Sequence, residues 1–227
     1  MARLARITVP GLPHHVTQRG NRRQPLFVEA GDYALYRDLL AERCRANAVS
    51  CWAYCLMPNH VHLILAPATS EGLSRALGEA HRRYTAFFNA RARVTGHLFQ
   101  GRFASVAMDE RHCLNAVRYL ALNPIRAGLA DTPKGWPHSS VAAHLAGRDD
   151  ALASVAPVLA MAPRFADLLA GSTSEEFPPG EFAPSAAGGR PLGDAEFLAM
   201  VERLLGRSVQ PGRRGRKPKA RRGGKIT

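Results

Sequence analysis

Two histidines stand at positions 60 and 62 inside an apolar, partly β-branched run, Met57-Pro58-Asn59-His60-Val61-His62-Leu63-Ile64-Leu65. Such a run is typical of a buried strand, in which alternate side chains point to the same face. His60 and His62 are therefore expected side by side, with Val61 on the opposite face. Because neutral imidazole is the commonest metal ligand in proteins, the pair indicates half of a metal site. The structural alternative is two packed histidines near a sheet edge.

A tyrosine and an asparagine farther along the chain could complete such a site. Tyr119 and Asn123 are four residues apart in a helical pattern, so they share one helix face. A phenol can attack phosphorus once a metal polarises the phosphate, and a carboxamide can supply an oxygen ligand. The helix taken alone favours a simpler interpretation, in which Tyr119 is a half-buried core residue and Asn123 ends the helix before Pro124. Among the five tyrosines, only Tyr119 has a ligand-capable partner one turn later.

The charge of the chain is strongly positive and unevenly distributed. The formal net charge is +13, with +9 in residues 1–147, −5 in residues 148–206 and +9 in residues 207–227. A basic domain, an acidic spacer and a basic tail indicate a polyanionic partner, for which nucleic acid is the first candidate. The alternative is a solubilising surface with a disordered tail.

Composition also limits the class of protein. No run approaches the roughly 18 apolar residues that a membrane helix requires, so no membrane span is expected. The amino-terminal residues lack the apolar stretch and cleavage site of a signal peptide. The four cysteines have no Cys-x-x-Cys spacing, which favours reduced thiols in a cytoplasmic protein over a disulfide framework or a zinc ribbon.

The elements that must position these residues follow the order β-α-β-β-α-β. This order predicts an α+β fold, a ferredoxin-like (RRM-like) sandwich with an antiparallel sheet, to which a third helix is added. That helix is expected to stop before Pro124 because a proline disfavours helical backbone in the residue before it. The predicted segments, in chain order, are a strand over His14–Arg19, a helix over 30–47, a strand over 49–56, a turn at Pro58-Asn59, a strand over His60–Ala66, a helix over 72–92, a short strand near Ala104–Met108 and a helix over Glu110–Leu122.

Several motifs, in this order, resemble those of the single-tyrosine HUH transposases (IS200-like), and most closely the REP-associated tyrosine transposase branch. The resemblance covers roughly residues 1–145. It implies a ferredoxin-like core with His60 and His62 on the central sheet, Tyr119 as nucleophile and Asn123 as third ligand of a Mg²⁺ or Mn²⁺ ion. The motifs that carry it are His15-Val16-Thr17-Gln18-Arg19-Gly20-Asn21-Arg22 with Phe27 after it, Met57 to Leu63, Leu98-Phe99-Gln100-Gly101-Arg102-Phe103, and Arg118-Tyr119-Leu120-Ala121-Leu122-Asn123-Pro124-Ile125-Arg126-Ala127-Gly128-Leu129.

The resemblance also implies a mechanism and a substrate. Tyr119 would attack a phosphate in single-stranded DNA or a DNA hairpin, leaving a 5′-phosphotyrosine and a free 3′-OH. Because bond energy is kept in that link, no nucleotide cofactor is needed, in agreement with the absence of a GxxxxGK[ST] loop. The branch is tied to short palindromic repeats and favours a monomer. The candidate phosphate-binding side chains are Arg19, Arg22, Arg23, Arg82, Arg83, Arg102, Arg118 and Arg126.

The predicted domain organisation follows from the same resemblance and from composition. Residues 1–147 are expected to form the transposase domain, 148–190 a helical acidic segment with a linker, and 191–227 a short helix with a basic DNA-binding tail. The tail contains Arg214, Arg216 and Lys217 in a sequence that resembles an AT-hook, an arm that lies in the A·T minor groove. Nonspecific phosphate binding by the tail is the favoured alternative.

Other classes of enzyme and a binding protein can be compared with the transposase interpretation. The few acidic residues in the first 147 count against a nuclease with a carboxylate triad, and a two-histidine phosphoesterase would need Thr or Ser where His62 stands. A histidine-triad hydrolase would need a third histidine at Ile64. Two imidazoles also suit zinc. A non-catalytic DNA- or RNA-binding module on the same fold is the main alternative, with Trp52 and Tyr54 as its base-stacking candidates.

Overall fold

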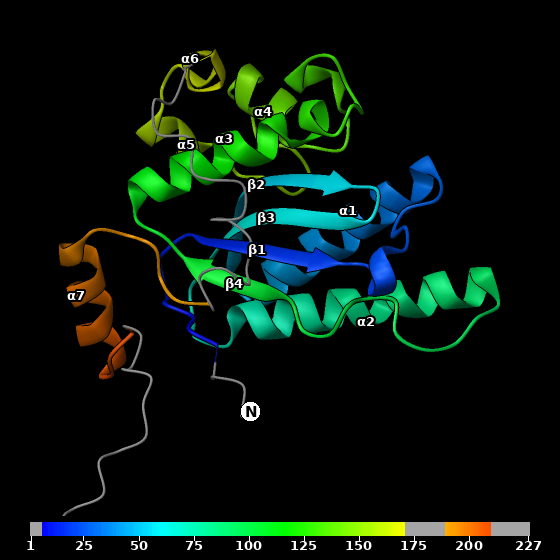
Figure 1. The fold of residues 1–227 in the computed structure, drawn as a ribbon, viewed down its shortest axis with the longest axis horizontal. Helices are drawn as coiled ribbons and strands as arrows, with labels where there is room; N and C mark the ends of the chain where they lie inside the picture. The colour runs from blue at the N-terminus through cyan, green and yellow to red at the C-terminus, as the bar shows by residue number, and fades with distance from the viewer. Residues whose placement is uncertain (1–5, 171–188, 210–227) are drawn as a thin grey trace, which may run out of the picture.

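The computed structural model describes residues 6–170 and 189–209, and the predicted linker and basic tail fall mostly outside these ranges. Figure 1 shows the elements along the chain. In order they are β1 (His14–Arg19), the short 3₁₀ helix η1 (Asn21–Arg23), α1 (Ala30–Ala46), β2 (Val49–Met57), β3 (His60–Pro67), α2 (Gly72–Ala92), β4 (Ala104–Ala107), α3 (Glu110–Arg126), η2 (Pro133–Gly135), α4 (Val141–Ala146), α5 (Ala156–Met161), α6 (Phe165–Ala170) and α7 (Ala195–Leu205).

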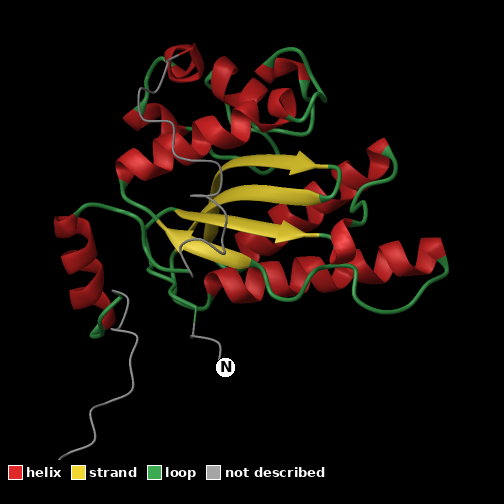
Figure 2. Ribbon diagram, in the orientation of Figure 1, coloured by secondary structure: helices red, strands yellow, loops and turns green. Residues whose placement is uncertain are grey.

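The four strands form one antiparallel sheet in the order β2-β3-β1-β4, which Figure 2 shows side by side. The chain thus places β1 and β3 at the centre, each paired on both sides. The predicted α+β, ferredoxin-like arrangement is confirmed. Because β3 is central, the His-Val-His segment lies in the most constrained part of the sheet, with His62 opposite Thr17 on β1 and Cys55 on β2.

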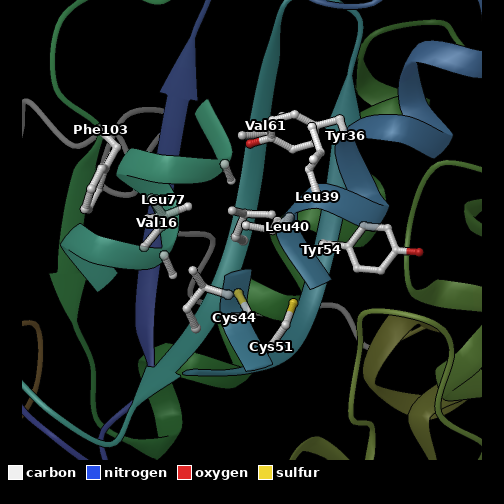
Figure 3. Packing of buried hydrophobic residues seen from close by; sticks show 14 of the residues in the cluster. Val16, Tyr36, Leu39, Leu40, Cys44, Cys51, Tyr54, Val61, Leu77 and Phe103 are labelled. Atoms are coloured by element: carbon white, nitrogen blue, oxygen red, sulfur yellow. The ribbon is translucent and has the colours of Figure 1, made fainter. Parts of the chain in front are cut away.

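The two faces of the sheet carry two different cores. On one face Val61, Leu63 and Leu65 of β3 pack with residues of α1 and α2, as Figure 3 shows for Val61, Leu40 and Leu77. On the other face Ile64 packs with α3, α5 and α6. Since side chains alternate along a strand, His60 and His62 share the face of Ile64 and point toward α3. This alternation confirms that Val61 faces away from the two histidines.

The third helix differs from its prediction at its carboxyl end. It continues to Arg126 and contains Pro124, whereas the sequence analysis ended it at Leu122. A proline near the end of a helix removes only its own N–H, and here the Ala127 amide still donates to the Asn123 carbonyl (3.0 Å). At the other end, Asp109 caps the helix by accepting from the His112 amide. Asn123 therefore lies inside a helical turn rather than ending the helix.

The later segments pack against both edges of the sheet. On the β2 side, the Leu56 amide donates to the His138 carbonyl, and Val158 and Phe165 join the core under α3. On the β4 side, the Leu192 amide donates to the Ala107 carbonyl, and α7 packs there. The division of the chain at residues 147 and 190 stays a prediction. Within the residues described, no helix is long and apolar enough to cross a membrane.

Candidate active site

The two histidines of β3 lie beside a tyrosine of α3. The imidazole rings of His60 and His62 are 4.9 Å apart between centroids and nearly perpendicular, at 81°. The Tyr119 ring lies 5.5 Å from His62, again edge to face at 79°. Tyr119 is half-buried at the border of the α3 core, while His62 is only 6% exposed. The predicted nucleophile and the two predicted histidine ligands are thus brought together from two elements that lie more than 50 residues apart in sequence.

A third histidine, His15 of β1, completes this cluster. Its Nε2 lies 3.0 Å from Nδ1 of His62, and the two rings stack with centroids 5.2 Å apart. From the sequence, His15 belongs only to a family motif and is not predicted to lie beside His62. The signal was available, since His15 and Thr17 share one face of β1 and Thr17 is opposite His62. Using that signal required knowing that β1 pairs with β3.

The other histidine, His60, has a different neighbour. Its Nδ1 lies 2.7 Å from Oδ1 of Asn59, the residue before it in the turn between β2 and β3. Asn59 in turn donates from Nδ2 to the Arg23 carbonyl oxygen, at 3.3 Å. Asn59 therefore joins His60 to the turn that follows β1.

Burial keeps all three imidazoles neutral. Desolvation lowers the pKa of His15 to about 4, and desolvation together with the positive charge of Arg19 lowers the pKa of His60 to about 4. The pKa of His62 lies well below its ordinary value, mainly through burial and also because a proton on His62 would be disfavoured by repulsion involving His15, His60 and Arg19. A neutral imidazole has one nitrogen with a free lone pair, which is the form that binds a metal.

Asn123 supplies an observation that fits a metal ligand. Its Nδ2 is buried and has no hydrogen-bond partner among the described residues. A buried amide that lacks a partner is unusual, and the N and O of such a group can be exchanged by a half-turn of the side chain. Within the described ranges no three His, Cys, Asp or Glu side chains form a metal-binding group. The predicted role of the Asn123 amide oxygen as a third ligand beside the two imidazoles therefore stays a prediction, and the unpartnered Nδ2 is compatible with it.

Two of the predicted basic residues belong to this site. The guanidinium of Arg126 lies over the Tyr119 ring, with its Cζ 5.3 Å from the ring centroid. Arg126 is exposed and lies two turns after Tyr119, on the same side of α3. Arg19 ends β1 directly opposite His60 in the strand register. Arg118 is half-buried on α3 next to Tyr119 in the sequence, and its side chain makes contacts of its own.

The turn after β1 presents two further arginines beside the site. Arg22 and Arg23 are exposed and both have positive φ angles, 52° and 63°, a left-handed backbone that is unfavourable for residues other than glycine. The turn is held by the Leu98–Phe103 motif, because the Asn21 amide donates to the Leu98 carbonyl at 2.8 Å. It also requires Gly20, where a Cβ would approach the Gln24 carbonyl oxygen to 2.2 Å. The strained turn thus places the backbone of Arg23 next to Asn59, with the two arginine side chains exposed.

The other predicted arginines do not join this group. Arg82 and Arg83 lie on α2, which packs on the opposite face of the sheet, and they form ion pairs with Glu79 and Glu42. Arg102 is exposed in the loop before β4. Arg214, Arg216 and Lys217 lie outside the described residues.

The base-stacking candidates of the non-catalytic alternative are placed on different faces. A β-bulge between Cys51 and Ala53 shifts the register of β2. As a result Trp52 packs against the α3 core, whereas Tyr54 is buried in the core under α1 and α2 and donates from its hydroxyl to Asp150 at 2.8 Å. The two rings therefore do not form a shared stacking surface.

Comparisons with known proteins relate the chain to a family and to solved structures. The family model described as transposase, IS200-like, matches residues 8–123. A solved structure of a REP-associated tyrosine transposase bound to a REP hairpin superposes with a TM-score of 0.56 and 22% identity, covering 68% of this chain and 93% of that chain. A candidate transposase from Deinococcus radiodurans is 21% identical over 56% of this chain and 98% of its own, with a TM-score of 0.37, too low to support an argument. A search of curated proteins found no match.

Proposed function

The chain belongs to the family of IS200-like transposases, enzymes that act on DNA, and from this premise we propose that it cleaves and rejoins single strands through Tyr119. The observation that supports the proposal is the convergence of His60 and His62 of β3 with Tyr119 of α3. Asn123 follows Tyr119 by one turn on α3, and its Nδ2 has no partner among the described residues. A nucleophile, two neutral imidazoles and an amide ligand are the groups that this chemistry needs.

The family is in general one of metal-dependent transposases. In this chain the ion would be held by the imidazoles of His60 and His62 and the amide oxygen of Asn123, and we assign it as Mg²⁺ or Mn²⁺. When bound, such an ion polarises the phosphate and offsets the charge that develops on the leaving 3′ oxygen. The short distance between the His60 and His62 rings suits binding of one ion by both.

Tyr119 carries the covalent step. Its hydroxyl oxygen bonds to the phosphorus as the bond from phosphorus to the 3′ oxygen breaks, so the phenol proton is released and the 3′ oxygen gains one. The product is a 5′-phosphotyrosine and a free 3′-OH. In strand transfer another 3′-OH attacks the same phosphorus and restores the phenol. The number of phosphate ester bonds is unchanged throughout, so no nucleotide cofactor enters the reaction.

The basic residues near Tyr119 would hold the phosphates on either side of the reacting one. Arg126, which covers the Tyr119 ring, and Arg19, opposite His60, are best placed to do so. Arg22 and Arg23 extend the positive surface beyond the end of β1. We also assign a part in phosphate binding to Arg118, which is next to Tyr119 in the sequence, and a smaller one to Arg102 in the loop before β4. We assign Arg82 and Arg83, which are paired with carboxylates on the other face, a smaller part in binding.

We propose a DNA hairpin as the substrate. The REP-associated relative was solved with a REP hairpin bound, and its fold matches most of this chain. The exposed turn at Arg22 and Arg23 gives a positive surface on which the backbone of a folded strand could rest. The basic tail with Arg214, Arg216 and Lys217 would add affinity for the same partner. We expect one chain to contain a complete site and the enzyme to act as a monomer.

A cleavage assay tests this function. Labelled single-stranded hairpins are incubated with Mg²⁺ or Mn²⁺ and the products separated on denaturing gels, which retain any covalent protein–DNA adduct. We expect a metal-dependent adduct with the wild type, and none with Tyr119→Phe or His62→Ala. Tyr33→Phe is the matched control, because Tyr33 lies outside the site against Phe27 and His138. Binding without an adduct in either metal would reject the catalytic proposal and favour the DNA-binding module.

A further inference from the structure

Each of the two proposed ligand histidines has its Nδ1 atom occupied by a neighbouring side chain. For His60 the neighbour is Oδ1 of Asn59, at 2.7 Å. The orientation of the Asn59 amide is determined by its other end, where Nδ2 donates to the carbonyl oxygen of Arg23. Reversing the amide would place its oxygen against that carbonyl and leave two acceptors in contact. Because Oδ1 can only accept, His60 carries its hydrogen on Nδ1 and keeps a lone pair on Nε2.

For His62 the neighbour is Nε2 of His15, at 3.0 Å. One hydrogen lies between these two nitrogens, and the atom that carries it decides the role of His62. If His15 donates, then neutral His62 has its hydrogen on Nε2 and cannot bind a metal there. If His62 donates, its Nε2 is free to bind, as at His60. Both residues are buried, with 3% of His15 and 6% of His62 exposed, so bulk water does not compete for this hydrogen bond.

We propose that Asn59 and His15 are positioning residues that hold His60 and His62 in the tautomer with hydrogen on Nδ1, so that both Nε2 atoms face the metal. This inference rests on the proposed function. Metal-binding histidines in general donate their second ring N–H to an acceptor that fixes the tautomer and the orientation of the ring. Here the two acceptors come from different elements, a turn residue for His60 and a buried histidine of β1 for His62.

The arrangement at Asn59 also links the metal site to the proposed DNA surface. Its amide contacts His60 with one end and the Arg23 backbone with the other. Arg22 and Arg23 are exposed and are held in a left-handed turn. A phosphate bound by these arginines would therefore be connected to the orientation of His60 through a single side chain.

Two substitutions at Asn59 separate its contacts. Asn59→Asp keeps an oxygen acceptor for His60 but loses the N–H that reaches Arg23. Asn59→Leu has a similar size and loses both. A residue that only secures the turn would respond equally to both changes, whereas a positioning residue would tolerate the aspartate. For the second histidine, His15→Phe keeps an aromatic ring against His62 and removes the acceptor.

The experiment uses the full-length protein in two measurements. Long-range ¹H–¹⁵N correlation spectra of the metal-free protein identify the tautomers of His60 and His62, and titration with Mn²⁺ followed by electron paramagnetic resonance gives the affinity. We expect hydrogen on Nδ1 of both residues in the wild type. We expect Asn59→Asp to bind Mn²⁺ like the wild type, and Asn59→Leu and His15→Phe to bind it about 10- to 100-fold more weakly. Thermal unfolding checks that each variant is folded.

Three results would overturn the inference. Hydrogen on Nε2 of His62 in the metal-free wild type is one, and equal weakening in Asn59→Asp and Asn59→Leu is another. Unchanged affinity in Asn59→Leu and His15→Phe is the third. A wild type that binds neither Mn²⁺ nor Mg²⁺ rejects the proposed function instead. In that case the spectra of the metal-free protein alone test the positioning role. Hydrogen on Nδ1 of both histidines in the wild type, and a changed tautomer in Asn59→Leu and His15→Phe, would support it.

Discussion

The two faces of the sheet each carry a histidine beside a tyrosine, and the two pairs differ in how their polar atoms are used. Between α1 and α2, which cover one face, the Tyr36 hydroxyl lies 3.0 Å from Nε2 of His81, and Tyr36 is completely buried. Under α3, His62 meets Tyr119 edge to face, and Tyr119 is only partly covered. The first pair uses its hydrogen bond to stabilise a core. The second leaves its reactive groups near an unpartnered amide and an exposed arginine.

This difference supports the proposal that the pair beside α3, and not the pair between α1 and α2, takes part in the reaction. Burial raises the pKa of the Tyr36 phenol and lowers the pKa of His81 to about 3, so both groups stay neutral. Perturbed pKa values by themselves therefore do not identify the site. What distinguishes the α3 face is the meeting of neutral imidazoles with a partly exposed nucleophile and nearby cations.

The largest difference between the faces is expected in metal binding. His62→Ala should weaken Mn²⁺ binding at least about 100-fold, because it removes a direct ligand of the proposed site. His81→Ala removes a partly buried imidazole of the same size on the other side of the sheet and should leave the affinity unchanged. Titration of both variants with Mn²⁺ makes the comparison. A similar loss of affinity in the two variants would show that the effect comes from a damaged fold rather than from the site.

For the free energy of unfolding, we expect the larger effect from the tyrosine between α1 and α2 and the smaller effect from the tyrosine of α3. Tyr36→Phe leaves the His81 nitrogen without its buried partner and should lower the free energy of unfolding by about 1–3 kcal/mol. Tyr119→Phe removes a hydroxyl from a partly exposed ring and should change that free energy by less than about 0.5 kcal/mol. Urea unfolding of both variants tests this. If Tyr119→Phe were the more destabilising change, Tyr119 would be a structural residue of the α3 core.

A pH effect is expected from His14, on the α1–α2 face of β1. The Val9 amide donates to its Nε2 at 3.1 Å, and burial lowers its pKa to about 4. Between about pH 6.5 and 4 the unfolded chain binds a proton at this residue and the folded chain does not. His14 should therefore lower the free energy of unfolding by about 1.4 kcal/mol for each unit by which the pH falls in that window. His14→Gln should have a correspondingly smaller slope in urea unfolding between pH 7 and 4.5, and an unchanged slope would contradict the assignment.

The smallest effect is expected from single arginines. Arg126→Ala on the α3 face should weaken binding of a single-stranded hairpin by about tenfold or less and lower the slope of log affinity against log salt by about 0.7. Arg82→Ala on α2 should change the affinity less, because Glu79 already offsets its charge. Fluorescence anisotropy across a salt series measures both. Equal effects would indicate that DNA contacts both faces of the molecule.

Features governed by local periodicity could be predicted from the sequence. The β-α-β-β-α-β order, the shared face of His60 and His62, and the placement of Tyr119 one turn before Asn123 all follow from the repeats of a strand and a helix. The bounds of β1 and α2 agree with prediction for the same reason. Pro124 was misjudged because a local rule that usually ends helices was overridden by the packing of a buried residue.

The neighbours that give the site its chemistry were decided by tertiary structure. His15 meets His62 only because β1 pairs with β3 in one particular register, and Arg126 reaches the Tyr119 ring only because α3 continues past Pro124. The bulge that separates Trp52 from Tyr54 likewise depends on how β2 pairs with β3. Strand pairing and packing join residues far apart in the chain, and no local pattern contains that information. The sequence alone determined which groups could react, and the tertiary structure decided which side chains orient them.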